Sequence, residues 1–153
     1  MDDLHALGRF IGPEHHFVLR VYFEDTDLTG VVYHANYLRF MERARSDMLL
    51  AAGIDQRAAH EGGEGAYAIA NLAIKFRTPA RLGDELTVVS RLVRLRAASV
   101  DIHQRVMRRE TIVTEAEVEA AFVSPSGRPR RQPPAWVAAF EPLVWPSGSN
   151  KGN

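Results

Sequence analysis

The sequence predicts an α+β domain in which a curved antiparallel sheet wraps around one long helix. One stretch, residues 36–53, has apolar residues at helical spacing. A strand-like stretch precedes it, and four more follow it in succession. Because such a run of strands favours an antiparallel sheet that covers one face of the helix, a single α+β unit is expected.

The first two elements are predicted from composition and period. About 15 leading residues contain Gly and Pro without periodicity and are expected to form a loose lead-in. The first strand is predicted over Phe17–Phe23, which is rich in β-branched and aromatic residues. The helix is predicted to start at Asn36 as its N-cap and to end just before Gly53. Its apolar face is expected to consist of Tyr37, Leu38, Phe40, Met41, Ala44, Met48 and Leu49.

The remaining elements follow the helix. Residues 56–65 are polar and glycine-rich, which predicts a short second helix and a mobile loop. Four strands are then predicted over residues 68–78, 85–95, 99–109 and 111–123. In the first of them, one face is expected to carry Ala70, Leu72, Ile74 and Phe76. The last strand alternates glutamates with apolar residues, which is typical of a sheet with one buried face. A closing helical turn is predicted over Trp136–Phe140.

Length and composition exclude several classes of protein. The chain of 153 residues is expected to be one domain over residues 1–153, with its core over about 17–140 and disordered termini, the tail beginning at Pro146. Nineteen basic and nineteen acidic residues give zero net charge, which argues against a nucleic-acid partner. Without cysteine there is no disulfide, thiolate zinc site or cysteine nucleophile. The longest apolar stretch, Met48–Ile54, is too short to span a bilayer, and the acidic start lacks a signal-peptide core, so a cytoplasmic protein is expected.

The basic residues are unevenly distributed. Seventeen of the nineteen are arginine, and residues 75–109 contain nine basic residues against three acidic ones, a local excess of six. Because the guanidinium group makes bidentate contacts with phosphate, a small phosphorylated ligand is one interpretation. Solvated strand faces are the other.

Common catalytic and metal-binding motifs are absent from the sequence. It contains no glycine-rich phosphate loop, dinucleotide fingerprint or nucleophile elbow. His60-Glu61 has Glu64 where a zinc-protease motif would place its second histidine. The six histidines show no paired ligand spacing apart from His15-His16, so no metal site is expected.

The segment from Arg20 to Arg45 carries the chemistry. Asp25 and Asp27 lie in a turn that leaves a strand, and His34 follows at the start of the long helix. Unpaired N–H groups at a helix N-terminus stabilise an oxyanion, while a nearby carboxylate attacks a carbonyl or deprotonates water. This arrangement suits acyl transfer from an activated ester. The alternative is that the two aspartates only form a turn and that His34 only caps the helix.

This segment resembles the active-site signature of the 4-hydroxybenzoyl-CoA thioesterase family of hotdog-fold enzymes, above all its Tol-Pal-associated, YbgC-like branch. The resemblance is carried by Arg20-Val21, Glu24-Asp25-Thr26-Asp27, Gly30-Val31-Val32-Tyr33-His34, Asn36-Tyr37 and Glu42-Arg43-Ala44-Arg45. The resemblance is weaker at Thr78-Pro79-Ala80-Arg81-Leu82-Gly83-Asp84 and Glu115-Ala116-Glu117. With these matches it covers about residues 17–140. It implies an α+β hotdog fold and hydrolysis of an acyl-CoA to free acid and CoA.

The resemblance also implies roles for residues around the helix start. Asp27 would be the catalytic carboxylate, acting as nucleophile or as general base. The backbone N–H of His34 would polarise the thioester carbonyl, and its ring would line the acyl pocket or assist a proton transfer. Tyr33 and Asn36 would shape the same mouth, and Asp25 would be structural. Glu42, on the helix, is expected to pair with Arg45 or Arg39 rather than to act as a base.

Binding partners are implied in the same way. Arg96 and Ser99 match the family's CoA-contacting region, with Arg94 and Arg81 as further candidates. The enzyme would need no metal or redox cofactor and would form a homodimer paired into a tetramer, with possible peripheral association with envelope machinery. An aroyl-CoA or acyl-carrier-protein thioesterase, or a non-catalytic envelope scaffold of the same fold, are the alternatives.

Overall fold

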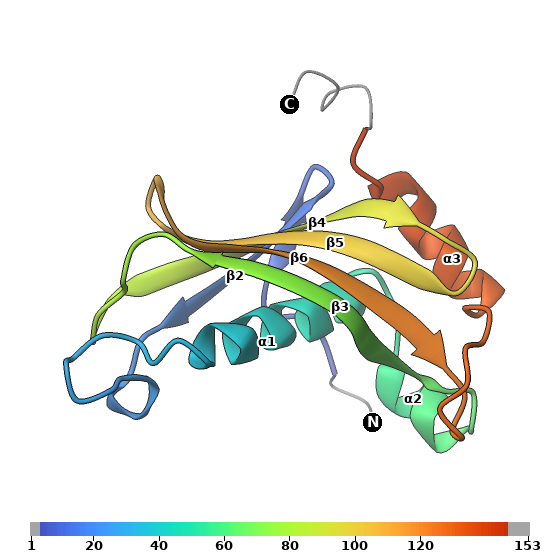
Figure 1. The fold of residues 1–153 in the computed structure, drawn as a ribbon. Coiled ribbons are helices and arrows are strands. Elements are labelled where there is room, and N and C mark those ends of the chain that lie inside the picture. Colours follow the sequence, from blue (N-terminus) through green and yellow to red (C-terminus); the bar gives the residue numbers. More distant parts are fainter. Residues whose placement is uncertain (1–3, 147–153) are drawn as a thin grey trace.

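Six strands form one antiparallel sheet in the computed structural model, which describes residues 4–146 (Figure 1). Their order across the sheet is β1-β2-β4-β5-β6-β3, so β3 lies at one edge and β1 at the other. The strands are β1 (Arg9–Ile11), β2 (Glu14–Arg20), β3 (Ala66–Phe76), β4 (Glu85–Leu95), β5 (Ser99–Arg108) and β6 (Thr111–Val123). The predicted α+β sheet with one long helix is confirmed, and the last four strands agree closely with their predicted bounds.

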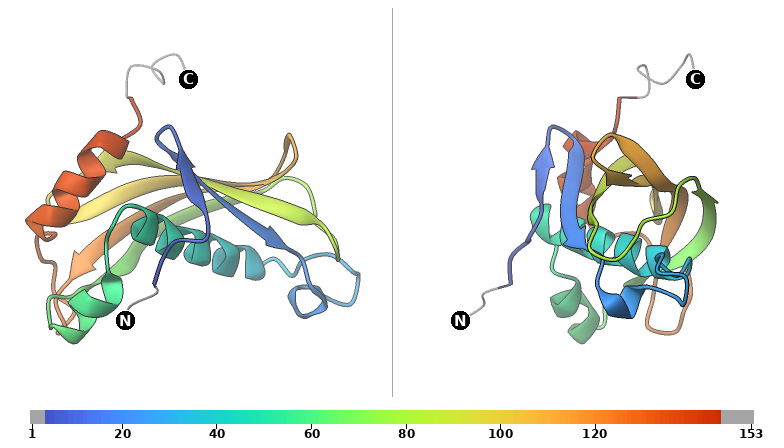
Figure 2. Two further views of the ribbon diagram at one scale, coloured as in Figure 1. Left: turned by 180° about the vertical axis from the view of Figure 1, so that it is seen from behind. Right: turned by 90° about the vertical axis from the view of Figure 1, so that its left-hand side faces the viewer.

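The helix α1 (Asn36–Ala51) lies in the concave side of the sheet. In the end-on view of Figure 2 the sheet curves around it. The predicted face is confirmed for Tyr37, Phe40, Met41, Ala44 and Met48, each at most 3% exposed. Burial of each Phe or Met side chain among them contributes about 1.5–3 kcal/mol, which makes this contact the main core of the fold.

The start of α1 differs from the prediction. Ala35, not Asn36, is the N-cap residue, and no side chain in the described part of the chain caps the helix. Tight turns precede the helix instead, with the Asn36 N–H donating to the Tyr33 carbonyl at 2.8 Å. The end agrees with the prediction, since Gly53 follows the helix with a φ of 84°, a conformation that favours glycine.

The N-terminal segment is better ordered than the sequence suggests. The predicted loose lead-in is wrong, because β1 pairs with β2 and the two form a hairpin around Gly12, whose φ is 61°. The first predicted strand begins three residues early, at Glu14, and ends at Arg20. A turn of 3₁₀ helix, η1 (Phe23–Asp25), replaces its last residues.

Smaller elements close the far end of the sheet. The predicted short helix is α2 (Gln56–Glu61), and the predicted closing turn is α3 (Pro134–Phe140), followed by η2 (Glu141–Leu143). In Figure 1 both helices lie beyond the C-terminal half of α1. The chain then returns to the sheet, where the Trp145 N–H donates to the Leu92 carbonyl at 2.7 Å. Beyond Pro146, the tail that was expected to be disordered lies outside the described residues.

A β-bulge changes which residues of β3 face the helix. The register with β6 shifts between Ile69 and Asn71, so Ala70 is an extra residue and strict alternation does not hold across it. Tyr67 pairs with Phe122, and Ile69 with Ala120, a residue that faces the core. Tyr67 and Ile69 therefore join Leu72, Ile74 and Phe76 on the concave face, which the alternation pattern does not predict.

A buried polar cluster fixes the C-terminal half of α1. The carboxylate of Asp47 accepts hydrogen bonds from the Leu7 and Gly8 N–H groups at 2.7 and 2.8 Å, and from His15 Nε2 at 2.8 Å. A Cβ at Gly8 would lie 2.3 Å from the His16 carbonyl oxygen, so only glycine allows this approach. The cluster ties β2 and the segment before β1 to the helix. Because the Asp47 carboxylate takes part in this cluster, it forms no ion pair with Arg43, one helical turn earlier.

This cluster predicts a stability that falls in mild acid. His15 is fully buried, and burial lowers its pKa below the ordinary value of 6.5, against the opposing effect of the Asp47 carboxylate. Below pH 6.5 the unfolded chain therefore binds a proton that the folded chain does not, and the free energy of unfolding decreases as the pH falls. Urea unfolding of wild type and His15→Gln at pH 8 to 5 should show a weaker pH dependence in the variant. Equal pH dependence would contradict this role of His15.

Candidate functional site

The loop between η1 and α1 folds back onto the start of the helix. Thr26 pairs with Val32, and the Asp27 N–H donates to the Val31 carbonyl at 2.9 Å. Val31 pairs in turn with Arg81, in the turn before β4. The loop is therefore held on two sides, which fixes its position at the N-terminal end of α1.

Asp27 presents an ionised carboxylate on this loop. Its Oδ1 accepts hydrogen bonds from the Thr29 hydroxyl at 2.6 Å and from the Thr29 N–H at 2.8 Å. These two donors hold the pKa of Asp27 below its ordinary value of 3.8. The side chain is exposed, so the carboxylate is charged at neutral pH and accessible to a ligand.

The start of α1, into which this loop leads, offers hydrogen-bond donors. Among residues 4–146, no group accepts a hydrogen bond from the backbone N–H of His34 or Ala35. Both lie at the positive end of the helix dipole, where they suit a developing oxyanion. The His34 ring contacts the rings of Tyr33 and Phe76, with centroids 4.7 and 6.0 Å apart. These rings, with Tyr33 and Phe76 about half exposed, form an apolar rim beside the donors.

Asp25 and Asn36 hold the loop in place. The buried Asp25 accepts a hydrogen bond at Oδ2 from the Tyr22 N–H at 2.8 Å. Its backbone carbonyl accepts one from the Tyr33 N–H and one from Asn36 Nδ2, each at 2.9 Å. The Asn36 side chain therefore braces the loop rather than capping the helix. The structure thus brings four of the predicted site residues to one place: Asp27, Tyr33, His34 and Asn36.

Arg96 and Ser99 lie at the other end of the sheet. They sit in and after the β4–β5 turn, whereas Asp27 lies near the start of β4, and the eleven residues of β4 extend about 35 Å. Arg96 donates to Asp101 Oδ1 at 2.7 Å, and Ser99 is buried. One copy of the chain therefore does not bring these two residues to Asp27.

Comparison with known proteins assigns the chain to a family. Residues 21–140 match the family model described as "Thioesterase-like superfamily". The chain belongs to this superfamily. An acyl-CoA thioester hydrolase YbgC from Escherichia coli O6:H1 is 38% identical over 125 residues, which are 80% of this chain and 92% of that protein.

Two further similarities add to this assignment. A 1,4-dihydroxy-2-naphthoyl-CoA hydrolase from Thermosynechococcus vestitus is 41% identical over 68 residues, 44% of this chain and 47% of that protein. The crystal structure of a probable thioesterase from Bartonella henselae is 38% identical with a TM-score of 0.75, covering 78% of this chain and 99% of that one. The fold of this chain is therefore the hotdog fold of thioesterases.

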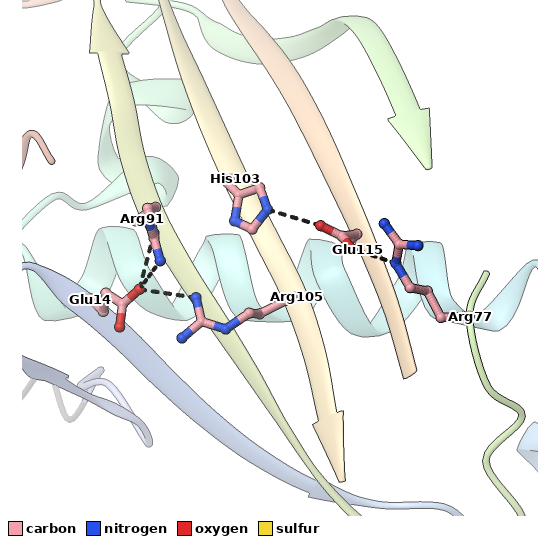
Figure 3. Close-up of polar contacts among 6 residues, drawn as sticks. All are labelled: Glu14, Arg77, Arg91, His103, Arg105 and Glu115. Atoms are coloured by element: carbon pink, nitrogen blue, oxygen red, sulfur yellow. Dashed lines mark hydrogen bonds and ion pairs between the residues drawn. The ribbon is translucent and has the colours of Figure 1, made fainter. Parts of the chain in front are cut away.

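Much of the arginine excess of this thioesterase-like chain is used within the sheet. On the outer face, one oxygen of Glu14 lies 2.8 Å from Arg91 and 3.0 Å from Arg105, and Glu115 lies between Arg77 and His103 (Figure 3). Arg96 and Arg108 also pair with carboxylates. Of the nine basic residues in 75–109, four form no ion pair with another described residue, namely Lys75, Arg81, Arg94 and Arg109.

The expected ion pair of Glu42 is not present. Within residues 4–146, Glu42 has no basic nitrogen within 4 Å, so it forms no close ion pair with Arg45 or Arg39. Burial lowers the pKa of Arg45, and the more distant charge of Glu42 acts against this by raising it. Arg45 instead donates to Gln104 Oε1 at 3.0 Å. Gln104 is fully buried and donates to the Met41 carbonyl, which satisfies it inside the core. The buried contact of Arg45 with Gln104 outweighed the i,i+3 spacing between Glu42 and Arg45. A single glutamine in a strand gives no sequence pattern that would reveal this contact.

Some residues of functional interest were missed by the sequence pattern. Thr29, which lowers the pKa of Asp27, lies in a turn where a hydroxyl side chain gives no distinctive pattern. Arg130 and Arg131 line an open groove next to Ala97 of the β4–β5 turn. No helix within residues 4–146 is long and apolar enough to cross a membrane. In the same part of the chain, no three His, Cys, Asp or Glu side chains cluster as metal ligands would.

Asp25 is predicted to matter for stability. Asp25→Ala removes the acceptor of the Tyr22 N–H at a buried position, so the free energy of unfolding should fall by about 1–2 kcal/mol. Its exposed neighbour Glu24 provides the matched control, and Glu24→Ala should change the value by less than about 0.5 kcal/mol. Urea unfolding measures both; equal effects would show that Asp25 does not brace the loop.

Proposed function

We propose that this chain is an acyl-CoA thioesterase in which Asp27 and the N-terminal end of α1 act on the thioester carbonyl. The observation that carries the proposal is an ionised, accessible carboxylate on the loop that leads into α1, together with two backbone N–H groups at the start of α1 that have no acceptor among the described residues. The named activity of the YbgC relative from Escherichia coli agrees with this chemistry. The reaction releases a free acid and CoA.

The proposed mechanism uses only groups of the chain and water. The thioester oxygen accepts hydrogen bonds from the His34 and Ala35 N–H groups, which stabilise the negative charge of the tetrahedral intermediate. In one route, the Asp27 carboxylate attacks the carbonyl carbon, CoA leaves as a thiolate that takes up a proton, and water hydrolyses the mixed anhydride. In the other, Asp27 takes a proton from the attacking water. Both routes end with the same products.

The rim of the site would orient the substrate. The His34 ring and Tyr33 would line the entry of the acyl group, and Asn36 would keep the loop in register through its bond to the Asp25 carbonyl. The low pKa of Asp27 suits a group that must be ionised before the reaction starts. No resident metal or redox cofactor takes part in this scheme.

A homodimer would complete the site. The edge strand β3 has no partner on its outer side among the described residues, and it exposes Ile69, Leu72 and Phe76. Such an edge is a template for pairing with another chain. A two-fold dimer through β3 would cover these side chains, and two such dimers would form the tetramer. A monomeric preparation is then expected to be inactive.

The dimer would also bring phosphate-binding residues to Asp27. Arg96 and Ser99, which are remote from Asp27 within one chain, would approach it from a second copy. Arg130 and Arg131 beside the same turn add positive charge there, which suits the phosphates of CoA. We propose that the protein is cytoplasmic. The resemblance to the YbgC-like branch implies that it associates peripherally with the Tol-Pal envelope machinery.

An aroyl-CoA substrate is the second candidate. The similarity to the naphthoyl-CoA hydrolase of Thermosynechococcus vestitus and the aromatic rim of His34, Tyr33 and Phe76 favour it. An acyl-carrier-protein substrate or a scaffold role has no such support. Release of CoA from a panel of aliphatic and aromatic acyl-CoAs distinguishes the two substrate classes.

The Asp27 carboxylate is predicted to be required for turnover. Asp27→Asn removes the negative charge but keeps the shape of the side chain, so kcat should fall by about 10²-fold or more, as for loss of a nucleophile or general base. Because the side chain is exposed, the melting temperature should stay close to that of wild type. CoA release with a thiol reagent measures the rate, with Glu24→Gln as the charge-matched control. Unchanged turnover in Asp27→Asn would exclude this mechanism.

Thr29 is predicted to influence the pH range in which the Asp27 carboxylate acts. Thr29→Val removes the hydroxyl that donates to Asp27 Oδ1, so the pKa of Asp27 should rise. Activity requires the ionised form, so the acid limb of the pH profile of kcat/KM should move to higher pH. Thr26→Val is the control, because the Thr26 hydroxyl donates to the Phe23 carbonyl instead. An acid limb that stays in place in Thr29→Val would show that Asp27 does not set it.

A further inference from the structure

The side chain of Tyr37 carries a hydroxyl group from the first turn of α1 into the core. The residue is only 3% exposed, and its ring packs against Phe40 and Phe76, with centroids 5.9 and 6.0 Å apart. Phenylalanine would satisfy this packing, and a buried hydroxyl is costly unless it forms a hydrogen bond. The Tyr37 hydroxyl accepts one from the Ala80 N–H at 3.1 Å. The tyrosine therefore provides a polar contact that the packing of the core does not require.

Ala80 connects this hydroxyl to the loop that carries Asp27. The Ala80 carbonyl accepts a hydrogen bond from the Val32 N–H at 2.8 Å. The peptide group between Val31 and Val32 also accepts one at its carbonyl, from the Asp27 N–H at 2.9 Å. Because a peptide group is planar and rigid, its carbonyl and its N–H move together. Three hydrogen bonds in series therefore lead from the Tyr37 hydroxyl to the backbone of Asp27.

The preceding helix residue holds the same loop from its other side. Asn36 Nδ2 donates to the Asp25 carbonyl at 2.9 Å, upstream of Asp27. Tyr37 acts on the peptide group downstream of Asp27. Two adjacent residues in the first turn of α1 thus restrain both ends of the loop relative to the helix. Because the proposed oxyanion donors lie at the start of that turn, these contacts determine where the carboxylate stands relative to the donors.

The segment between β3 and β4 has other contacts on both sides of Ala80. Before it, the Thr78 N–H donates to a carbonyl of β6 at 3.1 Å, and Arg108 donates to the carbonyl next to Ala80 at 2.9 Å. After it, the Gly83 N–H donates to the Val21 carbonyl at 2.9 Å. Within residues 4–146, the Ala80 N–H has no acceptor except the tyrosine hydroxyl. Loss of the hydroxyl is therefore expected to shift the middle of the segment and to leave the fold intact.

The hydroxyl is not placed to react with a substrate. It lies in the core, and burial raises the pKa of Tyr37 above its ordinary value of 10.0, against the opposing effects of the Ala80 N–H and the Arg108 charge. It therefore stays a neutral hydrogen-bonding group over the pH range of an ordinary assay. Its effect on turnover has to pass through the groups that it holds.

We propose that Tyr37 is a positioning residue, whose hydroxyl fixes the Asp27 carboxylate relative to the N-terminal end of α1. This inference rests on the proposed thioesterase function, and it adds a residue on which efficient turnover depends. Asp27 remains the group that acts on the thioester.

Removal of the hydroxyl alone tests the effect on turnover. Tyr37→Phe keeps the ring, and kcat should fall by up to about 10²-fold, the cost of a displacement of about 1 Å in an active site. KM should stay close to that of wild type. The acid limb of the pH profile should also stay in place, because Thr29 still donates to Asp27 within the loop. A wild-type kcat in Tyr37→Phe would overturn the inference.

A second buried hydroxyl provides the matched control. Ser90 is fully buried on β4, and its hydroxyl accepts a hydrogen bond from Gln104 Nε2 at 3.0 Å. Ser90→Ala should lower the melting temperature, as Tyr37→Phe does, but it should leave kcat unchanged because this hydroxyl has no connection to the Asp27 loop. An equal loss of kcat in the two variants would mean general destabilisation and would contradict the inference.

A double variant tests whether Tyr37 acts through Asp27. Added to Asp27→Asn, Tyr37→Phe should slow turnover no further, because the carboxylate that it positions is already absent. Single-turnover measurements with excess enzyme give the rates of the slow variants. If Tyr37→Phe lowers the rate by the same factor with and without the Asp27 carboxylate, the two residues act independently and the inference is wrong.

Amide hydrogen exchange tests the position of the loop without turnover. In Tyr37→Phe the Asp27 and Val32 N–H groups should exchange faster than in wild type, because the hydrogen bonds in series open more often when Ala80 is no longer held. The Trp145 N–H, bonded to Leu92 at the far end of the sheet, is the internal reference and should not change. Unchanged exchange at Asp27 and Val32 would overturn the inference.

Failure of the proposed function gives a different result. If wild type releases no CoA from any acyl-CoA while exchange in Tyr37→Phe is faster, the thioesterase is overturned and the restraint of the loop by Tyr37 is supported. If wild type releases CoA and Tyr37→Phe does so equally fast, the thioesterase is retained and this inference alone is overturned.

Discussion

Burial of one face of α1 in the concave side of the sheet is the interaction on which the rest of the structure depends. Tyr37, Met41, Ala44 and Met48 are almost fully buried there, and the sheet has to curve to cover them. The same contact fixes the direction of α1, and so the position, beside the Asp27 loop, of the two N–H groups that have no acceptor within residues 4–146. The site is therefore a consequence of how the core is packed.

Buried polar groups set the position of the helix along the sheet. Asp47 binds two backbone N–H groups and His15, while Gln104 binds the Met41 carbonyl and Arg45. An apolar interface alone tolerates sliding, because dispersion contacts have little directionality. A hydrogen bond between buried groups does not, because an unpaired buried group is costly. These contacts give α1 one register, which a site at its N-terminus requires.

The charges of the chain are divided between structure and function. On the outer face, Glu14 and Glu115 are paired with arginines across the sheet, so that part of the local positive excess stabilises strand pairing. Arg130 and Arg131 lie at the far end of the sheet, beside the β4–β5 turn. The net charge of zero therefore combines two features: balanced ion pairs across the sheet, and a small basic region around Arg130 and Arg131.

Local sequence determined the long helix and the later strands, and it pointed to the loop that carries the candidate site. The helical period over residues 36–53, the alternation of the later strands and the Asp27-to-His34 spacing are all short-range features, which act through backbone geometry and are visible in the letters. Only the tertiary structure decided the rest. The bulge beside Ala70 and the Asp47 cluster each depend on residues far apart in the chain, and the segment before the short β1 hairpin is tied to that cluster. Burial sets such contacts, and burial is a property of the folded chain, which a local pattern does not contain.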